Sequence, residues 1–132
     1  MSIAVDLERL RAEAEARGPG AFLLTVTDDG RPHVVAVVAG TDDEGALAMS
    51  VGRTSVRNAG ARPGVTLLWP PAEAGGYSLI VDGEAEAQPS PAGDGGHITV
   101  GVTRAVLHRP AAGRPDDPDA CGSDCVPLRD GP

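Results

Sequence analysis

The sequence predicts a mostly β protein in which one N-terminal helix is followed by six strands. Three observations lead to this fold class. Apolar residues near the start recur at helical spacing, six later segments are rich in apolar and β-branched residues, and Gly, Pro and Asp separate those segments. Short strands at short spacing are typical of a small closed or partly closed barrel.

The first element is predicted as a helix over residues 3–17, because apolar side chains recur there at near-helical spacing with charges between them. Ser2 or Asp6 can cap its start. Gly18-Pro19-Gly20 ends it, since Gly takes the left-handed position after a helix and Pro cannot continue one.

A hairpin follows, with strands over residues 21–27 and 32–39. The turn Asp28-Asp29-Gly30-Arg31 joins them, and Asp-Gly is the strongest short hairpin signal. The nearly continuous apolar run of the second strand predicts burial on both of its faces. A polar turn at residues 41–45 then leads into a third strand over residues 46–51.

The second half of the chain is predicted as a short helix over residues 55–61 and three further strands. Arg62-Pro63 closes the helix. The strands cover residues 65–69, 77–87 and 98–107, and Asp82-Gly83 marks a bulge or a bend in the middle one.

Length and charge limit the function. With 132 residues the chain fits one domain, and we assign residues 1–109 to the barrel and residues 110–132 to a flexible Pro- and Asp-rich tail. A net charge of −8 excludes general binding to nucleic acid or to an anionic membrane surface. There is no membrane-span run of roughly 18 apolar residues and no signal-peptide pattern, so we expect a soluble cytoplasmic protein. Only three residues are aromatic, and the resulting thin core predicts further burial against a partner subunit.

Residues 50–63 combine the groups that bind a phosphate. Three guanidiniums, from Arg53, Arg57 and Arg62, stand beside the hydroxyls of Ser50, Thr54 and Ser55 and the N–H groups of a helix start. Bidentate guanidiniums, hydroxyl donors and a positive helix end all favour an anion. The alternative is a solvated helix face whose arginines pair with acids such as Asp42, Asp43 or Glu44.

These segments resemble the flavin-binding split β-barrel proteins related to pyridoxamine 5′-phosphate oxidase. The resemblance spans about residues 9–110 and is strongest at residues 21–38, at residues 52–69 and at Val81-Asp82-Gly83-Glu84-Ala85. It implies a six-stranded antiparallel split β-barrel with an N-terminal helix, which forms a homodimer with cofactor sites at the interface. Members bind FMN or the deazaflavin coenzyme F-420. Some bind haem, and others have no known ligand.

The resemblance also implies which residues hold the cofactor. Arg53-Thr54-Ser55 occupies the place of the family's phosphate-binding run, Ser50 precedes it on the strand, and Arg57-Asn58 matches the Arg-Asn that follows. His33 begins the strand that lies against the flavin ring, and Trp69 stands near ring or substrate contacts. One departure concerns the Lys that usually completes the phosphate cradle, which falls at Ser55 in a chain without Lys.

Two functions therefore remain open. The first is an FMN- or deazaflavin-dependent oxidoreductase with a small-molecule substrate, in which the cofactor carries the redox chemistry. The alternative is a non-catalytic split barrel that binds a flavin, haem or another small ligand, or an orphan dimer that has lost its cofactor. No residue is assigned as catalytic, and no Ser-His-Asp arrangement or carboxylate pair supports hydrolysis.

The two cysteines of the tail, Cys121 and Cys125, are given no role. Three residues separate them, which is neither a zinc-ribbon nor a thioredoxin spacing. In a reducing cytoplasm we expect free thiols, and no metal site is predicted.

Overall fold

The computed structural model describes residues 2–111, and its eight strands and two helices lie within that range. The strands are β1 (Ser2–Ala4), β2 (Gly20–Val26), β3 (Pro32–Val38), β4 (Gly40–Thr41), β5 (Leu47–Val51), β6 (Gly64–Trp69), β7 (Ser78–Pro89) and β8 (Gly96–His108). The helices are α1 (Leu7–Arg17) and α2 (Arg53–Ala61). The predictions for Cys121 and Cys125 and for residues 112–132 of the tail fall outside the described residues.

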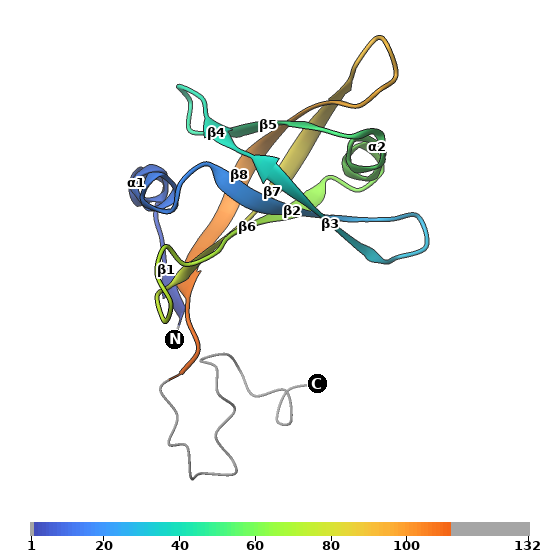
Figure 1. Ribbon diagram of the computed structural model, residues 1–132. Coiled ribbons are helices and arrows are strands. Elements are labelled where there is room, and N and C mark those ends of the chain that lie inside the picture. The colour runs from blue at the N-terminus through green and yellow to red at the C-terminus, as the bar shows by residue number, and fades with distance from the viewer. Residues whose placement is uncertain (1, 112–132) are drawn as a thin grey trace.

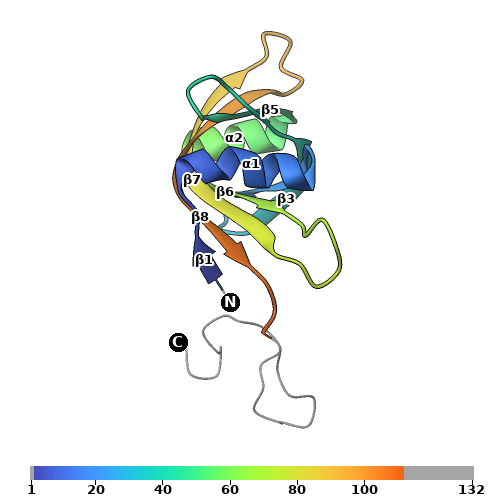
Figure 2. The ribbon, with the colours of Figure 1, turned by 90° about the vertical axis from the view of Figure 1, so that its left-hand side faces the viewer.

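All strands join one antiparallel sheet in the order β3-β2-β6-β7-β8-β5-β4, with β1 also paired to β8. The sheet curls until β3 lies against β5, yet no ladder joins these two strands within the described chain. The helices lie on opposite sides of the barrel, with the strands between them (Figures 1 and 2). This arrangement confirms the predicted split barrel. The six predicted strands correspond to the main ones, and β1 and β4 are short additions.

The first helix is shorter than predicted. It starts at Leu7, because Asp6 is its N-cap and the Asp6 carboxylate accepts a hydrogen bond of 2.8 Å from the backbone N–H of Arg9. The residues before it form β1, in which Ser2 pairs with His108 of β8. The predicted start at residue 3 was therefore wrong, since a ladder to a strand more than 100 residues later leaves no local signal. The predicted end of the helix is confirmed, with Gly18 as the C-cap at φ +87°.

The β2–β3 hairpin is confirmed. The backbone N–H of Thr27 donates to the carbonyl of Arg31 at 2.9 Å, and Gly30 takes the positive φ of +82° that this turn needs. The predicted burial of β3 on both faces is wrong for the single chain. Val34 is 53% exposed and Val38 is 71% exposed.

The core is largely aliphatic, as expected, and α2 joins it through Ala59 and through a buried polar contact. Leu23, Leu67 and Leu79 are fully buried. The Asn58 side-chain amide of α2 donates to the Thr25 hydroxyl of β2 at 3.1 Å, in a buried contact. The predicted irregularity at Asp82-Gly83 is confirmed as a shift in the β7–β8 register.

Candidate functional site

The split between β3 and β5 opens into a cavity of about 490 Å³, called here the split cavity. One wall comes from β3, and the other comes from the end of β5 and the first turn of α2. Its lining residues are His33, Val35, Ala36, Val37, Ser50, Val51, Gly52, Arg53, Thr54 and Ser55. No acidic side chain of the described chain lines it.

The start of α2 gives the split cavity its positive end. Gly52 is the N-cap and has no side chain to accept a hydrogen bond from the first turn, and that turn contains no acidic residue. The first backbone N–H groups of a helix have no partner within the helix. Together with the helix dipole they favour an anion at this position.

The structure brings together five of the predicted site residues at the split cavity. Two stand on opposite strands, His33 on β3 and Ser50 on β5, and three follow on the first turn of α2. These five residues are His33, Ser50, Arg53, Thr54 and Ser55. Ser55 is only 2% exposed, so the position at which the resemblance leads one to expect a Lys holds a short, buried hydroxyl.

Arg57 lies one turn further along α2 and lines a second cavity, called here the hairpin cavity. This cavity has a volume of about 640 Å³ and lies between α2 and the end of the β7–β8 hairpin. Arg53 and Thr54 line both cavities, so they stand between the two. The predicted arginines therefore do not all line one cavity, since Arg53 lines both cavities and Arg57 lines only the hairpin cavity.

Two predicted site residues lie away from both cavities. Asn58 is fully buried and bound to Thr25, which ties α2 to the sheet. Trp69 is 1% exposed and lines a third cavity beside α1. Neither residue lines the split cavity or the hairpin cavity.

The charges around α2 distinguish Arg62 from the other two arginines. Arg62 pairs with the Asp28 carboxylate and also donates to the carbonyl of Val26. The Arg62 hydrogen bond and charge lower the pKa of the exposed Asp28 carboxyl, with a smaller contribution from the charge of Arg57. Arg53 and Arg57 make no ion pair within residues 2–111. The alternative of arginines paired with acids therefore holds for Arg62, through Asp28, but not for Arg53 or Arg57 within the described chain.

Sequence reasoning missed the residues that complete the hairpin cavity. Ala87, Pro89, Gly93 and Gly95 face α2 only because the β7–β8 hairpin folds back over it. They are small or cyclic residues in a Pro- and Gly-rich loop, which carries no chemical signal of its own. Of the site residues, only the hydroxyls and guanidiniums concentrated at residues 50–57 could be recognised from the sequence.

The geometry suits one class of ligand. The α2 end of the split cavity offers a guanidinium, two hydroxyls and helix N–H groups, whereas the β3 wall offers Val35 and Val37. A phosphate attached to a flat, largely apolar group matches both ends. Within residues 2–111 no three His, Cys, Asp or Glu side chains gather as metal ligands. No described helix is long and apolar enough to span a membrane.

Sequence comparison finds relatives over nearly the whole chain. Uncharacterized proteins of Mycobacterium bovis and Mycobacterium tuberculosis are each 45% identical over 136 residues, which covers 92% of this chain and 93% of theirs. No family model matches the sequence.

Comparison with solved structures finds the same fold. A candidate pyridoxamine 5′-phosphate oxidase from Listeria innocua has a TM-score of 0.63 at 15% identity, over 76% of this chain and 96% of that one. An F-420 reductase has a TM-score of 0.55 at 24% identity, over 68% and 91%. The haem storage protein of Vibrio cholerae has a TM-score of 0.56 at 18% identity, over 77% and 94%. At these identities the likeness shows the fold.

Proposed function

Because this chain belongs to one family with the two mycobacterial proteins and has the split-barrel fold of pyridoxamine 5′-phosphate oxidase-like proteins, we propose that it is an oxidoreductase that binds FMN or the deazaflavin coenzyme F-420. The observation that carries the proposal is the split cavity. It combines a cationic, N–H-rich end with an apolar strand wall, and its lining within residues 2–111 contains no acidic side chain.

The residues of the chain have separate roles in this proposal. Arg53, Thr54 and the start of α2 bind the cofactor phosphate, and Ser50 adds a hydroxyl from β5. The β3 wall supports the ring, with His33 at its end. When bound, such a cofactor supplies hydride chemistry, and the protein provides binding and orientation.

Titration with pairs of ligands that differ only in the phosphate tests this proposal. We expect saturable binding of FMN or of coenzyme F-420 in calorimetry, and clearly weaker binding of riboflavin or of the phosphate-free deazaflavin. A charge-assisted hydrogen bond is worth about 1.5–3 kcal/mol, so losing one such contact weakens binding about tenfold or more. Equal binding with and without the phosphate would contradict the assigned phosphate end.

The second candidate is a non-catalytic binding protein, and Ser55 favours it because a short, buried hydroxyl replaces a cationic contact. Turnover separates the two functions. The oxidoreductase reoxidises its reduced cofactor in the presence of a small-molecule substrate, whereas a carrier binds a flavin or haem without turnover. A cytoplasmic location stays a prediction from the sequence.

We further propose that the protein is a homodimer joined through the outer face of β2 and β3. Facing pairs on this hairpin, Phe22 with Ala36 and Leu24 with Val34, turn apolar side chains away from the core. Val38 continues this face and is 71% exposed. An apolar face of this kind favours burial against a second copy. It adjoins the split cavity through Ala36, so the partner subunit would complete the cofactor site.

A charge on this face is expected to separate the subunits. Val38→Glu should give a monomer in light scattering after size exclusion, because a buried, unpaired carboxylate is costly. Leu7→Glu is the matched control, since Leu7 is 64% exposed on α1. A dimer that survives Val38→Glu, or that Leu7→Glu breaks equally, would overturn this interface.

A further inference from the structure

The hairpin cavity is a second binding space, separated from the split cavity by Arg53 and Thr54, which line both. It lies between α2 and the loop of the β7–β8 hairpin, which stands above α2 in Figure 1. Its volume of about 640 Å³ falls within the roughly 300–1,000 Å³ that is typical of small-molecule sites.

One face of α2 forms a wall of the hairpin cavity. The residues of this face recur at intervals of three and four, which is the spacing of one helix face: Arg53, Val56, Arg57 and Gly60. Val56 is 7% exposed and gives the wall an apolar base, whereas both arginines are exposed. No acidic side chain of the described chain lines the cavity. An anion that enters it therefore meets guanidiniums without a competing carboxylate in the lining.

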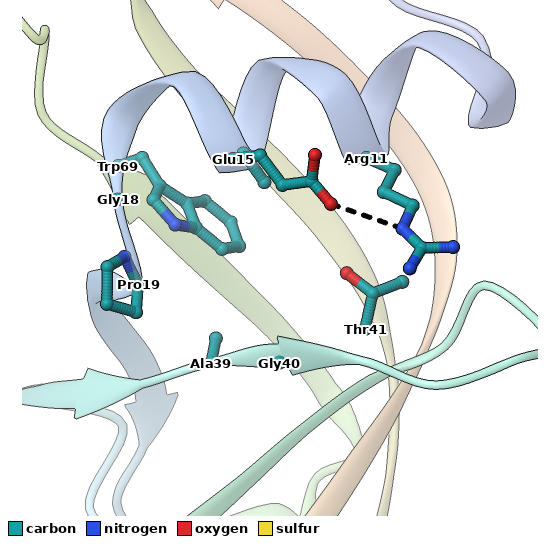
Figure 3. A pocket seen from close by; sticks show the side chains of 9 residues that line it. Arg11, Glu15, Gly18, Pro19, Ala39, Gly40, Thr41 and Trp69 are labelled. Carbon is teal, nitrogen blue, oxygen red and sulfur yellow. Dashed lines mark hydrogen bonds and ion pairs between the residues drawn. The ribbon is translucent and has the colours of Figure 1, made fainter.

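The cavity beside α1 also contains an arginine, but the charge of that arginine is already paired. Arg11 and Glu15 both line it, and the Arg11 Nε donates to the Glu15 carboxylate at 3.3 Å (Figure 3). Arg53 is unpaired within residues 2–111 but is shared with the split cavity. Among the described guanidiniums, Arg57 is therefore the one that is free of ion pairs and lines the hairpin cavity but not the split cavity.

The opposite wall is held in place and consists largely of backbone. A Cβ at Gly95 would collide with the carbonyl oxygen of Val51, so this end of the hairpin packs directly on the end of β5. Within the loop, the backbone N–H of Ser90 donates to the carbonyl of Gly95 at 2.7 Å. On the facing helix, a Cβ at Gly60 would meet no atom within 4 Å. A planar group can therefore approach the backbone closely on both sides.

We propose that the hairpin cavity binds a small aromatic carboxylate, whose carboxylate pairs with the Arg57 guanidinium and whose ring packs on Val56 and Pro89. A carboxylate and a guanidinium are both planar and can share two parallel hydrogen bonds. A single negative charge matches the one guanidinium that this cavity does not share. A flat ring matches the space that the glycines leave open. The binding of this ligand does not depend on a cofactor in the split cavity.

Calorimetric titration of the full-length protein with 2-naphthoate, without added flavin, tests the proposal. We expect saturable binding. The neutral 2-naphthamide has nearly the same shape and should bind at least about tenfold more weakly, because it lacks the charge-assisted contact. Cyclohexanecarboxylate, which has the charge without the flat ring, should also bind more weakly than 2-naphthoate.

Three outcomes of this titration would overturn the proposal. The first is that 2-naphthoate does not bind, and the second is that 2-naphthamide or cyclohexanecarboxylate binds equally well. The third is that 2-naphthyl phosphate binds more tightly than 2-naphthoate, which would assign the cavity to a phosphate monoester. Because no flavin is present, none of these results depends on the proposed cofactor.

Variants locate the ligand. Arg57→Gln should weaken 2-naphthoate binding about tenfold or more, and Arg57→Lys, which keeps the charge, should restore part of the affinity. Gly60→Leu places a side chain in the open part of the cavity and should abolish binding. Gly64→Leu is the matched control, since Gly64 is exposed, has no atom within 4 Å of an added Cβ and lines neither cavity.

Ser50→Ala separates the two cavities, because Ser50 lines the split cavity but not the hairpin cavity. The Kd of 2-naphthoate should be unchanged in this variant. Loss of affinity in Ser50→Ala as large as that in Arg57→Gln would move the ligand to the split cavity and overturn the proposal. A folded Gly60→Leu protein that binds 2-naphthoate as well as Gly64→Leu does would also overturn it.

Discussion

The double variant Arg53→Ala, Arg57→Ala is expected to bind FMN or coenzyme F-420 at least about tenfold more weakly than the unmodified protein. The Arg53 guanidinium at the phosphate contributes about 1.5–3 kcal/mol, which is about tenfold to a hundredfold in Kd, and loss of the Arg57 charge one turn further along α2 adds to this. Both guanidiniums are free of ion pairs within residues 2–111, so no directly paired carboxylate competes with the phosphate for them. Calorimetric Kd values for the bound cofactor measure the effect.

The single variants locate the phosphate. Arg53 lines both the split cavity and the hairpin cavity, whereas Arg57 lines the hairpin cavity. A phosphate at the start of α2 therefore predicts a larger loss for Arg53→Ala than for Arg57→Ala. The reverse order would move the phosphate to the hairpin cavity. Arg9→Ala with Arg104→Ala is the matched control, because it removes the same charge from exposed ion pairs that line neither cavity. An unchanged Kd in the Arg53, Arg57 double variant would contradict the site.

Gly83→Ala is expected to destabilise the fold by about 1–3 kcal/mol, as overpacking in a well-packed region does. A Cβ at Gly83 would stand 2.5 Å from the carbonyl oxygen of Gly101 and 2.5 Å from Val100 Cγ1. Both atoms belong to β8, at the place where the β7–β8 register shifts, so the two strands must move apart. For a domain of this size the melting temperature should fall by roughly 4–12 °C in a thermal denaturation experiment.

Gly101→Ala is the control for this effect. Gly101 lies on the opposite strand of the same ladder, is exposed, and would bring its Cβ no closer than 3.9 Å to the Glu84 carbonyl oxygen. Its melting temperature should stay close to that of the unmodified protein. If both variants lose the same stability, glycine removal from the ladder is the cause and the close approach at Gly83 is not.

Much of the fold could be predicted because its signals are local. The Asp-Gly turn with Gly30, the helix stop at Gly18 and the break at Asp82-Gly83 all lie within a few residues of the structure they cause. The amphipathic pattern of the first helix was equally clear, yet its start was missed. Ser2 and His108 pair although they are 106 residues apart in the sequence, and no property of residues 2–4 indicates that ladder.

The candidate site was likewise predicted only where its residues have a local sequence signal. The density of hydroxyls and guanidiniums at residues 50–57 marks the anion-binding end in the sequence alone. His33 joins that end because the sheet curls until β3 meets β5, which are not ladder neighbours. Trp69 was expected near the same site, but its side chain lies on the α1 side of the barrel.

The sequence by itself therefore determined the kinds of element, most turns and the chemistry of residues 50–57, because each depends on neighbouring residues and their hydrogen-bonding preferences. Only the tertiary structure decided which strands meet across the split, that Arg53 lines both cavities while Arg57 lines the hairpin cavity, and that Trp69 keeps an N–H without a partner in the described chain. These features depend on the curl of the barrel. The curl results from small twists that add up over many strand pairs, so no single segment of the sequence determines it.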